Sequence, residues 1–264
     1  MVPTTENVII KVCSNLDSYL PFRQHAPSLA NARRVIYADV NQLASDDGVG
    51  FFNVLAFRGV FFGSPFATSD HYQWFNSLDD WELFQDMEKE EANKYKGEKY
   101  YVKKQCYGQS QHGRKLSLLS SYWEKRLLWN DIFNKPENPT VEKVFNWLTS
   151  RDPKTSIKLF SNVGSLTALL ICGDLVEAGI LPMPLASEWA KIISKTRMGS
   201  KAGMVACGLV GENCSHDDFC SAFMLLDQAL QTELGDEEKE AMGYNIIMLE
   251  HALCKIKRIG VNLF

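Results

Sequence analysis

An acidic residue in an unusually apolar segment is the first candidate for chemistry in this chain of 264 residues. Asp174 lies in Leu166–Ile180, where Glu177 is the only other charged residue. A carboxylate in such surroundings is costly unless it is paired, hydrogen-bonded or placed at a pocket wall. At a pocket wall it can act as an acid, a base or a stabiliser of the positive charge that develops on a sugar during glycosidic cleavage. The alternative is a structural carboxylate that caps or bridges a neighbouring helix.

Arg58 is the second candidate catalytic residue, and it is flanked by the aromatic residues Phe57 and Phe61. One interpretation is a buried cation that pairs with a carboxylate such as Asp174. The other is an arginine whose stem covers apolar surface while its charged end reaches water.

A glycine turn precedes the apolar segment of Asp174. Asn162 and Gly164 both tolerate the backbone angles of a tight turn, and Ser165 and Thr167 follow at the start of the next expected helix. The free amide groups and the dipole of that helix favour a phosphate. These four residues are therefore predicted to bind phosphate. The alternative is an ordinary corner between helices with a C-cap.

A basic, glycine-containing segment is the second predicted phosphate site. Lys195, Arg197 and Lys201 surround Gly199 and Gly203. Small residues allow a backbone to approach a ligand closely, and the cations can hold phosphate. The alternative is a solvated loop with ordinary surface charges.

The order of these segments resembles a known family. Leu159–Ala168 resembles the hairpin of helix-hairpin-helix proteins such as DNA glycosylases, with Asn162 where that hairpin usually has glycine. Together with Asp174, Lys195–Met204 and Met248–Arg258, it resembles the α-glutamyl/putrescinyl thymine pyrophosphorylase-like family. The resemblance implies a helical fold related to DNA glycosylases and an association with hypermodified DNA bases. It covers roughly Leu159 to Arg258, under half of the chain.

The periodicity of apolar residues predicts a mainly α-helical protein with a short mixed amino-terminal segment. Residues 1–112 are expected to form a mixed, mainly helical part that continues into a helical part at 113–264. Val8–Val12 favours a strand, and the Lys- and Tyr-rich stretch Tyr95–Tyr107 favours an exposed, charged loop. The principal helices are expected at Asn31–Leu43, Leu116–Phe133, Val141–Leu148, Lys154–Phe160, Ser165–Glu177, His216–Leu234 and Glu237–Ile259.

Composition limits the cellular setting and the kind of partner. The net charge of −4 argues against a protein that coats nucleic acid through bulk charge, although a local basic site is compatible with it. Seven cysteines without a Cys-x-x-Cys pair, and no apparent signal peptide, predict a nuclear or cytoplasmic, intracellular protein with free thiols. No apolar stretch is long enough for a bilayer. Cys214, His216 and Cys220 lack a fourth ligand, so neither a metal nor a cofactor is expected.

Three functions remain open at this point. The first is an enzyme similar to a DNA glycosylase that acts on modified, thymine-type bases or nucleotides in DNA. The second is a helix-hairpin-helix module that binds DNA without catalysis. The third is a helical adaptor between proteins, in which exposed aromatic residues such as Trp74, Trp81 and Trp123 would form an interface.

Overall fold

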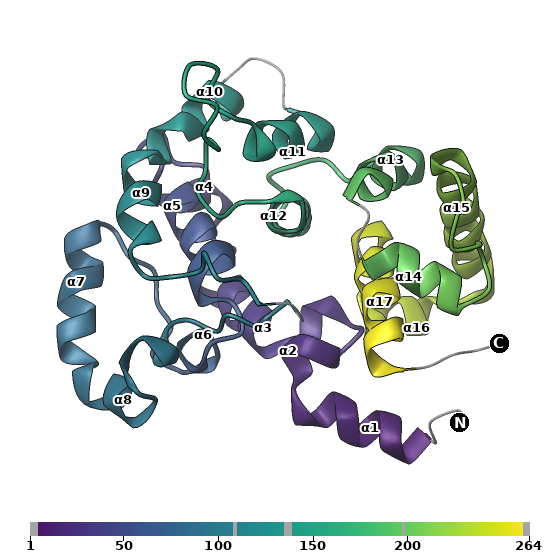
Figure 1. Ribbon diagram of the computed structural model, residues 1–264, viewed down its shortest axis with the longest axis horizontal. Helices are drawn as coiled ribbons and strands as arrows, with labels where there is room; N and C mark the ends of the chain where they lie inside the picture. Colours follow the sequence, from purple (N-terminus) through teal and green to yellow (C-terminus); the bar gives the residue numbers. More distant parts are fainter. Residues whose placement is uncertain (1–4, 108–109, 135–138, 197–198, 261–264) are drawn as a thin grey trace. The chain divides into compact units, whose positions relative to one another are not determined.

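Local capping residues fix several helix boundaries of this protein. The Thr140 hydroxyl accepts a hydrogen bond from the Lys143 amide in the first turn of α11 (Val141–Thr149). Ser215 and Asp218 form a reciprocal capping box at the start of α15 (His216–Glu233). The computed structural model describes residues 5–107, 110–134, 139–196 and 199–260, and within them the protein is mainly α-helical and contains no β-sheet (Figure 1).

The chain divides into two units, which are described separately. Unit 1 contains residues 1–26 and 184–264, and unit 2 contains residues 27–183. The expected division at residue 112 falls inside unit 2. Among the described residues, no helix is both long and apolar enough to cross a membrane.

Unit 2 consists of helices joined by turns and by longer irregular segments, such as residues 150–164 before α12. Its helical segments are α3 (Pro27–Val35), α4 (Val40–Leu43), α5 (Val49–Ala56), the π-helix η2 (Phe57–Phe61), α6 (Pro65–Thr68), α7 (Leu78–Met87), α8 (Lys89–Lys94), η3 (Gly97–Tyr100), α9 (Leu118–Glu124), η4 (Arg126–Trp129), α10 (Asn130–Phe133), α11 and α12 (Ser165–Glu177). α12 packs against α11 and η2. Its bounds coincide with the expected helix, and it is buried over most of its length.

Aromatic packing forms the core of unit 2. The Phe51 ring lies 5.2 Å from the rings of Trp129 and Trp147 and 5.3 Å from that of Phe160. Aromatic pairs at these separations stabilise a core beyond the area they bury. This packing holds α5 beside the loop that leads to α12.

Unit 1 contains α1 (Thr5–Ser14), α2 (Leu16–Tyr19), η1 (Arg23–His25), α13 (Ala186–Thr196), α14 (Gly199–Ala206), α15, α16 (Asp236–Met242) and α17 (Ile246–Ile259). α14 and α17 lie side by side (Figure 1). A methyl group added at Gly203 would overlap the carbonyl group of Leu253. The close approach of the two helices therefore requires glycine at this position.

Several sequence-based expectations about local structure were wrong. Val8–Val12 lies in helix α1 rather than in a strand. The single helix expected at Asn31–Leu43 is divided into α3 and α4, with Asp39 capping α4. The helices expected at Leu116–Phe133 and Glu237–Ile259 are also divided, the second at Gly243, where φ is 60°. Apolar spacing continued across these breaks, so it did not reveal them.

Two further expectations failed because the backbone or the side chains found other partners. Lys154–Phe160 forms no helix, because Arg151 and Lys158 form an isolated antiparallel bridge and Asp152 accepts hydrogen bonds from the amides of the turn between them. In the stretch Tyr95–Tyr107, expected to be an exposed loop, three tyrosines are buried in unit 2. They are Tyr100, Tyr101 and Tyr107.

Candidate functional site

The turn before α12 has the backbone geometry that the sequence predicts. Asn162 adopts a left-handed conformation with φ of 61°. Gly164 follows in an extended conformation as the N-cap of α12, and among the described residues no side chain caps the helix there. The first backbone hydrogen bond of the helix runs from the Ala168 amide to the Gly164 carbonyl at 2.9 Å.

The amide groups at the start of α12 are consequently available to a ligand. The first N–H groups of any α-helix have no partner within the helix, and they carry the positive end of its dipole. Here they belong to Ser165, Leu166 and Thr167, of which Thr167 is buried and the other two are half-buried. An anion of the size of a phosphate is the natural ligand of such a helix terminus.

Two lysines lie at the same turn. The ammonium group of Lys158 donates to the Val163 carbonyl at 3.3 Å, and that of Lys125 donates to the Leu159 carbonyl at 2.6 Å. Both bonds use uncharged acceptors, so the positive charges are not cancelled by them. The pKa of Asp152 is lowered first by the amide donors of Thr155 and Lys154, and the charge of Lys125 also contributes to that lowering. The turn therefore presents cations beside the open amides.

The carboxylate of Asp174 is buried in unit 2 and held by Arg58. The guanidinium Nε lies 2.5 Å from one carboxylate oxygen and Nη2 lies 2.6 Å from the other. The two residues are 116 positions apart in the chain. Of the two interpretations of Arg58, the buried cation that pairs with Asp174 is confirmed. A bidentate ion pair of this kind is among the strongest interactions between an arginine and a carboxylate.

Aromatic rings and a tyrosine complete the surroundings of this pair. The Arg58 guanidinium lies 5.0 Å from the ring centre of Phe57 and 4.6 Å from that of Phe62. Burial alone lowers the pKa of Arg58, but the charge and hydrogen bonds of Asp174 outweigh burial and raise it. The Tyr37 hydroxyl donates to Asp174 at 3.0 Å, and burial together with the charge of Asp174 raises the pKa of Tyr37 well above its usual value.

The π-helix η2 explains how Arg58 is oriented. Its widened turns leave carbonyl groups exposed to other donors, and two buried side chains satisfy them. Arg114 donates to the carbonyl of Val60 at 2.9 Å and to that of Arg58 at 3.1 Å, and the Tyr107 hydroxyl donates to the Arg58 carbonyl at 3.0 Å. π-helical turns occur frequently at functional sites. Here the wide turn fixes the backbone from which the guanidinium reaches α12.

A small pocket opens beside this cluster. It has a volume of about 180 Å³ and is lined by Leu29, Arg33, Tyr37, Asp174, Glu177 and Ala178. Because Arg58 engages both oxygens of Asp174, the carboxylate contributes a paired charge to the wall rather than an unengaged base. Tyr37 is half-buried, so it belongs both to the charged cluster and to the pocket.

Sequence reasoning missed Tyr37, Arg33 and Arg114 as parts of this cluster and its surroundings. Arg114 stands in a polar stretch and Arg33 on a helix with ordinary surface spacing, so their types and positions alone indicated solvent exposure. The sequence predicts Tyr37 inside one continuous helix, Asn31–Leu43. The end of α3 at Val35 instead turns its side chain toward α12.

The second predicted phosphate segment lies in unit 1 and has a different structure. Gly199 and Lys201 belong to helix α14, and Lys195 is exposed in the last turn of α13. The Lys201 ammonium donates to the Cys214 carbonyl at 3.3 Å. A methyl group at Gly199 would lie 3.1 Å from the sulfur of Cys254, so this glycine serves helix packing. Arg197 lies outside the described residues.

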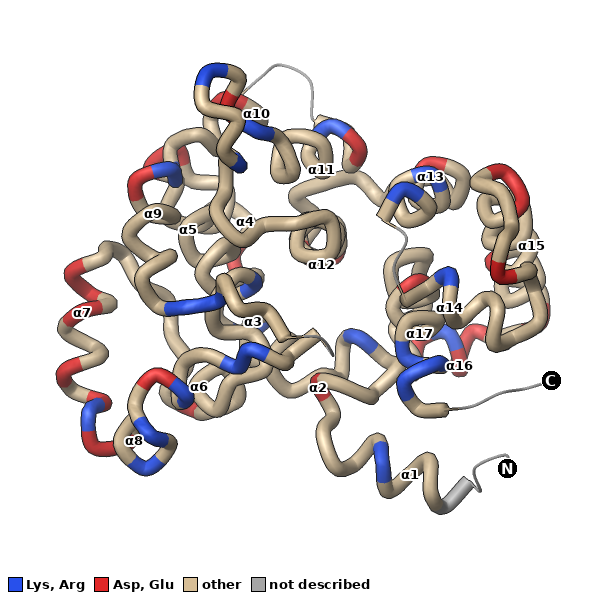
Figure 2. Tube along the Cα trace, in the orientation of Figure 1, with Lys and Arg blue, Asp and Glu red and all other residues tan. Residues whose placement is uncertain are grey.

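Charge and metal-binding residues give two further results. Figure 2 shows acidic residues along α7, namely Asp79, Asp80, Glu82 and Asp86, on a helix without basic residues. That helix would repel a polyanion, in contrast to the turn before α12. Among the described residues, no group of three or more His, Cys, Asp or Glu side chains is arranged to hold a metal ion.

No protein-family model matches this chain, and comparisons with curated proteins and with solved structures found no match either.

Proposed function

We propose that this protein binds DNA through the start of α12 and acts, in the manner of a DNA glycosylase, on a modified base or nucleotide. The observation that carries the proposal is the uncapped amino terminus of α12 behind the left-handed Asn162. A phosphate at this position would meet the amides of Ser165 and Leu166 and the positive charges of Lys125 and Lys158. The chemical step is assigned to the pocket beside Asp174, which lies on the same helix.

Substitutions of Gly164 test the binding step. A methyl group there would meet only the Lys158 ammonium, at 3.6 Å, so a side chain can be attached at this position without a clash at Cβ. In Gly164→Asp the new carboxylate caps the amides and repels phosphate, whereas Gly164→Ala leaves the amides open. We expect Gly164→Asp to stabilise the helix by only about a few tenths of a kcal/mol, since glycine is already a fair N-cap residue. We also expect it to weaken binding to labelled duplex DNA by at least about tenfold, corresponding to ~1.4 kcal/mol.

Fluorescence anisotropy at several salt concentrations provides the measurement. The wild-type protein and Gly164→Ala should bind with similar affinity, and binding should weaken as salt rises, because phosphate contacts release counterions. Wild-type affinity in Gly164→Asp would contradict the proposal. The same measurements on single-stranded DNA of identical sequence establish which form is bound.

A DNA-binding module without catalysis is the second candidate, and the Arg58–Asp174 pair favours it. A carboxylate with both oxygens engaged by a guanidinium offers less stabilisation to a developing positive charge than an unpaired one. Base release from DNA containing modified thymines separates the two functions. The enzyme predicts base release that Tyr37→Phe reduces without loss of DNA binding, because Tyr37 lines the pocket and not the turn. The module predicts binding with no release in either protein.

The structure gives less support to an adaptor. Of the three tryptophans that would form its interface, Trp81 is buried in the aromatic core of unit 2, within 5.2 Å of the Phe75 ring centre. Trp74 and Trp123 are only partly exposed. These residues therefore do not make a continuous exposed aromatic patch.

A further inference from the structure

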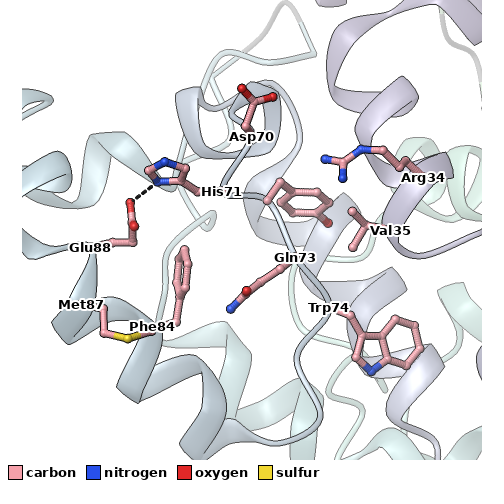
Figure 3. A pocket seen from close by; sticks show the side chains of 10 residues that line it. Arg34, Val35, Asp70, His71, Gln73, Trp74, Phe84, Met87 and Glu88 are labelled. Atoms are coloured by element: carbon pink, nitrogen blue, oxygen red, sulfur yellow. Dashed lines mark hydrogen bonds and ion pairs between the residues drawn. The ribbon is translucent and has the colours of Figure 1, made fainter.

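A second and larger pocket lies elsewhere in unit 2 and is not part of the site beside Asp174. Its volume is about 510 Å³, within the range of roughly 300–1,000 Å³ that is usual for small-molecule sites. The end of α3, the loop at residues 70–74 and the end of α7 form its walls (Figure 3). None of the residues predicted from the sequence to bind a ligand lines it.

The apolar part of this pocket is suited to a flat ring. Phe84 and Met87 come from α7, Val35 from the end of α3, and Tyr72 and Trp74 from the loop. Phe84 and Tyr72 are buried and held by the aromatic core, so their positions are fixed before a ligand arrives. Aromatic and thioether groups make favourable contacts with planar rings.

The polar part of this pocket contains one cation, the guanidinium group of Arg34. Arg34 makes no salt bridge with a described residue, and its hydrogen bond to the Asn31 side chain is long, at 3.5 Å. Figure 3 shows its guanidinium extending from α3 toward the loop of Gln73. An arginine in this setting is a natural partner for a carboxylate or a phosphate.

The acidic groups of the pocket are engaged or directed elsewhere. Glu88 accepts a hydrogen bond from His71 at 2.7 Å, and this interaction raises the pKa of His71. In Figure 3 the Asp70 carboxylate points away from Gln73 and Phe84. The Gln73 amide offers both a donor and an acceptor, as the edge of a heteroaromatic ring requires. The cation, the amide and the apolar wall therefore lie together in one hollow.

We propose that this pocket binds a small planar heteroaromatic anion, with its ring against Phe84 and Met87 and its acidic group at Arg34. The site is independent of the proposed DNA contact, because no residue of the turn before α12 contributes to it. A nucleoside monophosphate and an indole carboxylate share the required chemistry. They differ in whether the anion is a phosphate or a carboxylate.

Isothermal titration calorimetry on the full-length protein tests this proposal. The probes are adenosine monophosphate, adenosine, inorganic phosphate and indole-3-acetate. At least one of the two ring-bearing anions should bind at least about tenfold more tightly than adenosine or phosphate alone, which corresponds to ~1.4 kcal/mol. The tighter of the two identifies the anion as phosphate or carboxylate. Failure of both to bind at millimolar concentration would overturn the proposal.

Two neighbouring arginines provide a matched pair of variants. Arg34→Gln should remove the advantage of the charged ring ligand over adenosine, because the guanidinium is lost. Arg33→Gln, on the same helix, should leave it intact, since Arg33 lines the other pocket. Equal losses in the two variants would refute the assignment of the anion to Arg34. DNA binding by Arg34→Gln should equal that of the wild type. Loss of ligand binding in this pocket can therefore be distinguished from loss of DNA binding at α12.

Discussion

The two units bury positive charge in different ways. In unit 2, Arg58 is closed against Asp174 by two short hydrogen bonds. In unit 1, the ammonium group of buried Lys255 donates to the carbonyl groups of Asp17 and Ser18 at 2.9 and 2.8 Å, near the end of α2. The first cation makes its hydrogen bonds with a full negative charge, whereas the hydrogen bonds of the second go to backbone carbonyl groups.

The pKa values of the two cations move in opposite directions as a result. The interaction with Asp174 outweighs burial and raises the pKa of Arg58, whereas burial, together with the charge of Arg258, lowers the pKa of Lys255 to about 7. Glu250 lies in the same buried region of α17, and burial raises its pKa although it accepts a hydrogen bond from the Cys254 thiol at 3.0 Å. Carbonyl dipoles thus satisfy hydrogen bonds but do not recover the lost hydration of a charge. The stability of unit 1 is therefore expected to depend on pH near neutrality. The Arg58–Asp174 pair is expected to keep both of its charges in that range.

Breaking the pair in unit 2 should have the largest effect on stability. Asp174→Asn leaves the Arg58 cation buried without a counter-charge, so we expect a loss of about 3–5 kcal/mol in the free energy of unfolding. The double variant Arg58→Met, Asp174→Leu removes both charges and should recover most of that loss. Urea denaturation measures both. Tyr37→Phe is the control, and removal of its hydrogen bond to the charged carboxylate should cost about 1.5–3 kcal/mol.

A small loss in Asp174→Asn, comparable to that of Tyr37→Phe, would show that the pair is not held in the buried geometry. The comparison between the two units would then lose its basis.

Removing the lysine of unit 1 should have a smaller effect that depends on pH. Lys255→Met leaves two carbonyl groups without their donor and should cost about 1–3 kcal/mol. Lys257→Met, an exposed position on the same helix, is the control and should change little. Urea denaturation again gives the free energies.

The sign of the pH effect follows from the lowered pKa of Lys255. Between about 7 and the ordinary lysine value of 10.5, the unfolded chain binds more protons than the folded one. Stability therefore rises with pH across that window, and the cost of burying the charge is greatest below it. From pH 7 to 8.5 the wild type should gain up to about 2 kcal/mol relative to Lys255→Met. Identical pH dependence in the two proteins would contradict this account.

The sequence was informative where local chemistry decides the outcome. The helix expected at Val141–Leu148 begins at the predicted residue, Asn162 has the left-handed conformation that suits the predicted turn, and α12 has the predicted bounds. The burial of Asp174 in an apolar helix required a partner, and Arg58 was one of the candidates. Each of these conclusions depended on a few neighbouring residues or on one strong energetic requirement.

The remainder of the site depends on contacts between distant parts of the chain. Tyr37 reaches Asp174 across 137 positions, and Arg114 reaches the Arg58 carbonyl across 56. No spacing within the sequence encodes these distances. The helix predicted at Lys154–Phe160 does not form for another reason. Hydrogen bonds to Asp152 stabilise a turn that competes with the helix. The sequence predicts that Gly199 binds a ligand, because its close approach to Cys254 on another helix is not encoded in the neighbouring residues.

The central claim is that the open amides of α12 hold a DNA phosphate, and nuclear magnetic resonance can observe those amides directly. In a titration of the ¹⁵N-labelled protein with a short duplex, the amide signals of Ser165, Leu166 and Thr167 should shift, and at lower DNA concentration than those of α7. Shifts confined to other segments, with these three signals unchanged at saturation, would contradict the account.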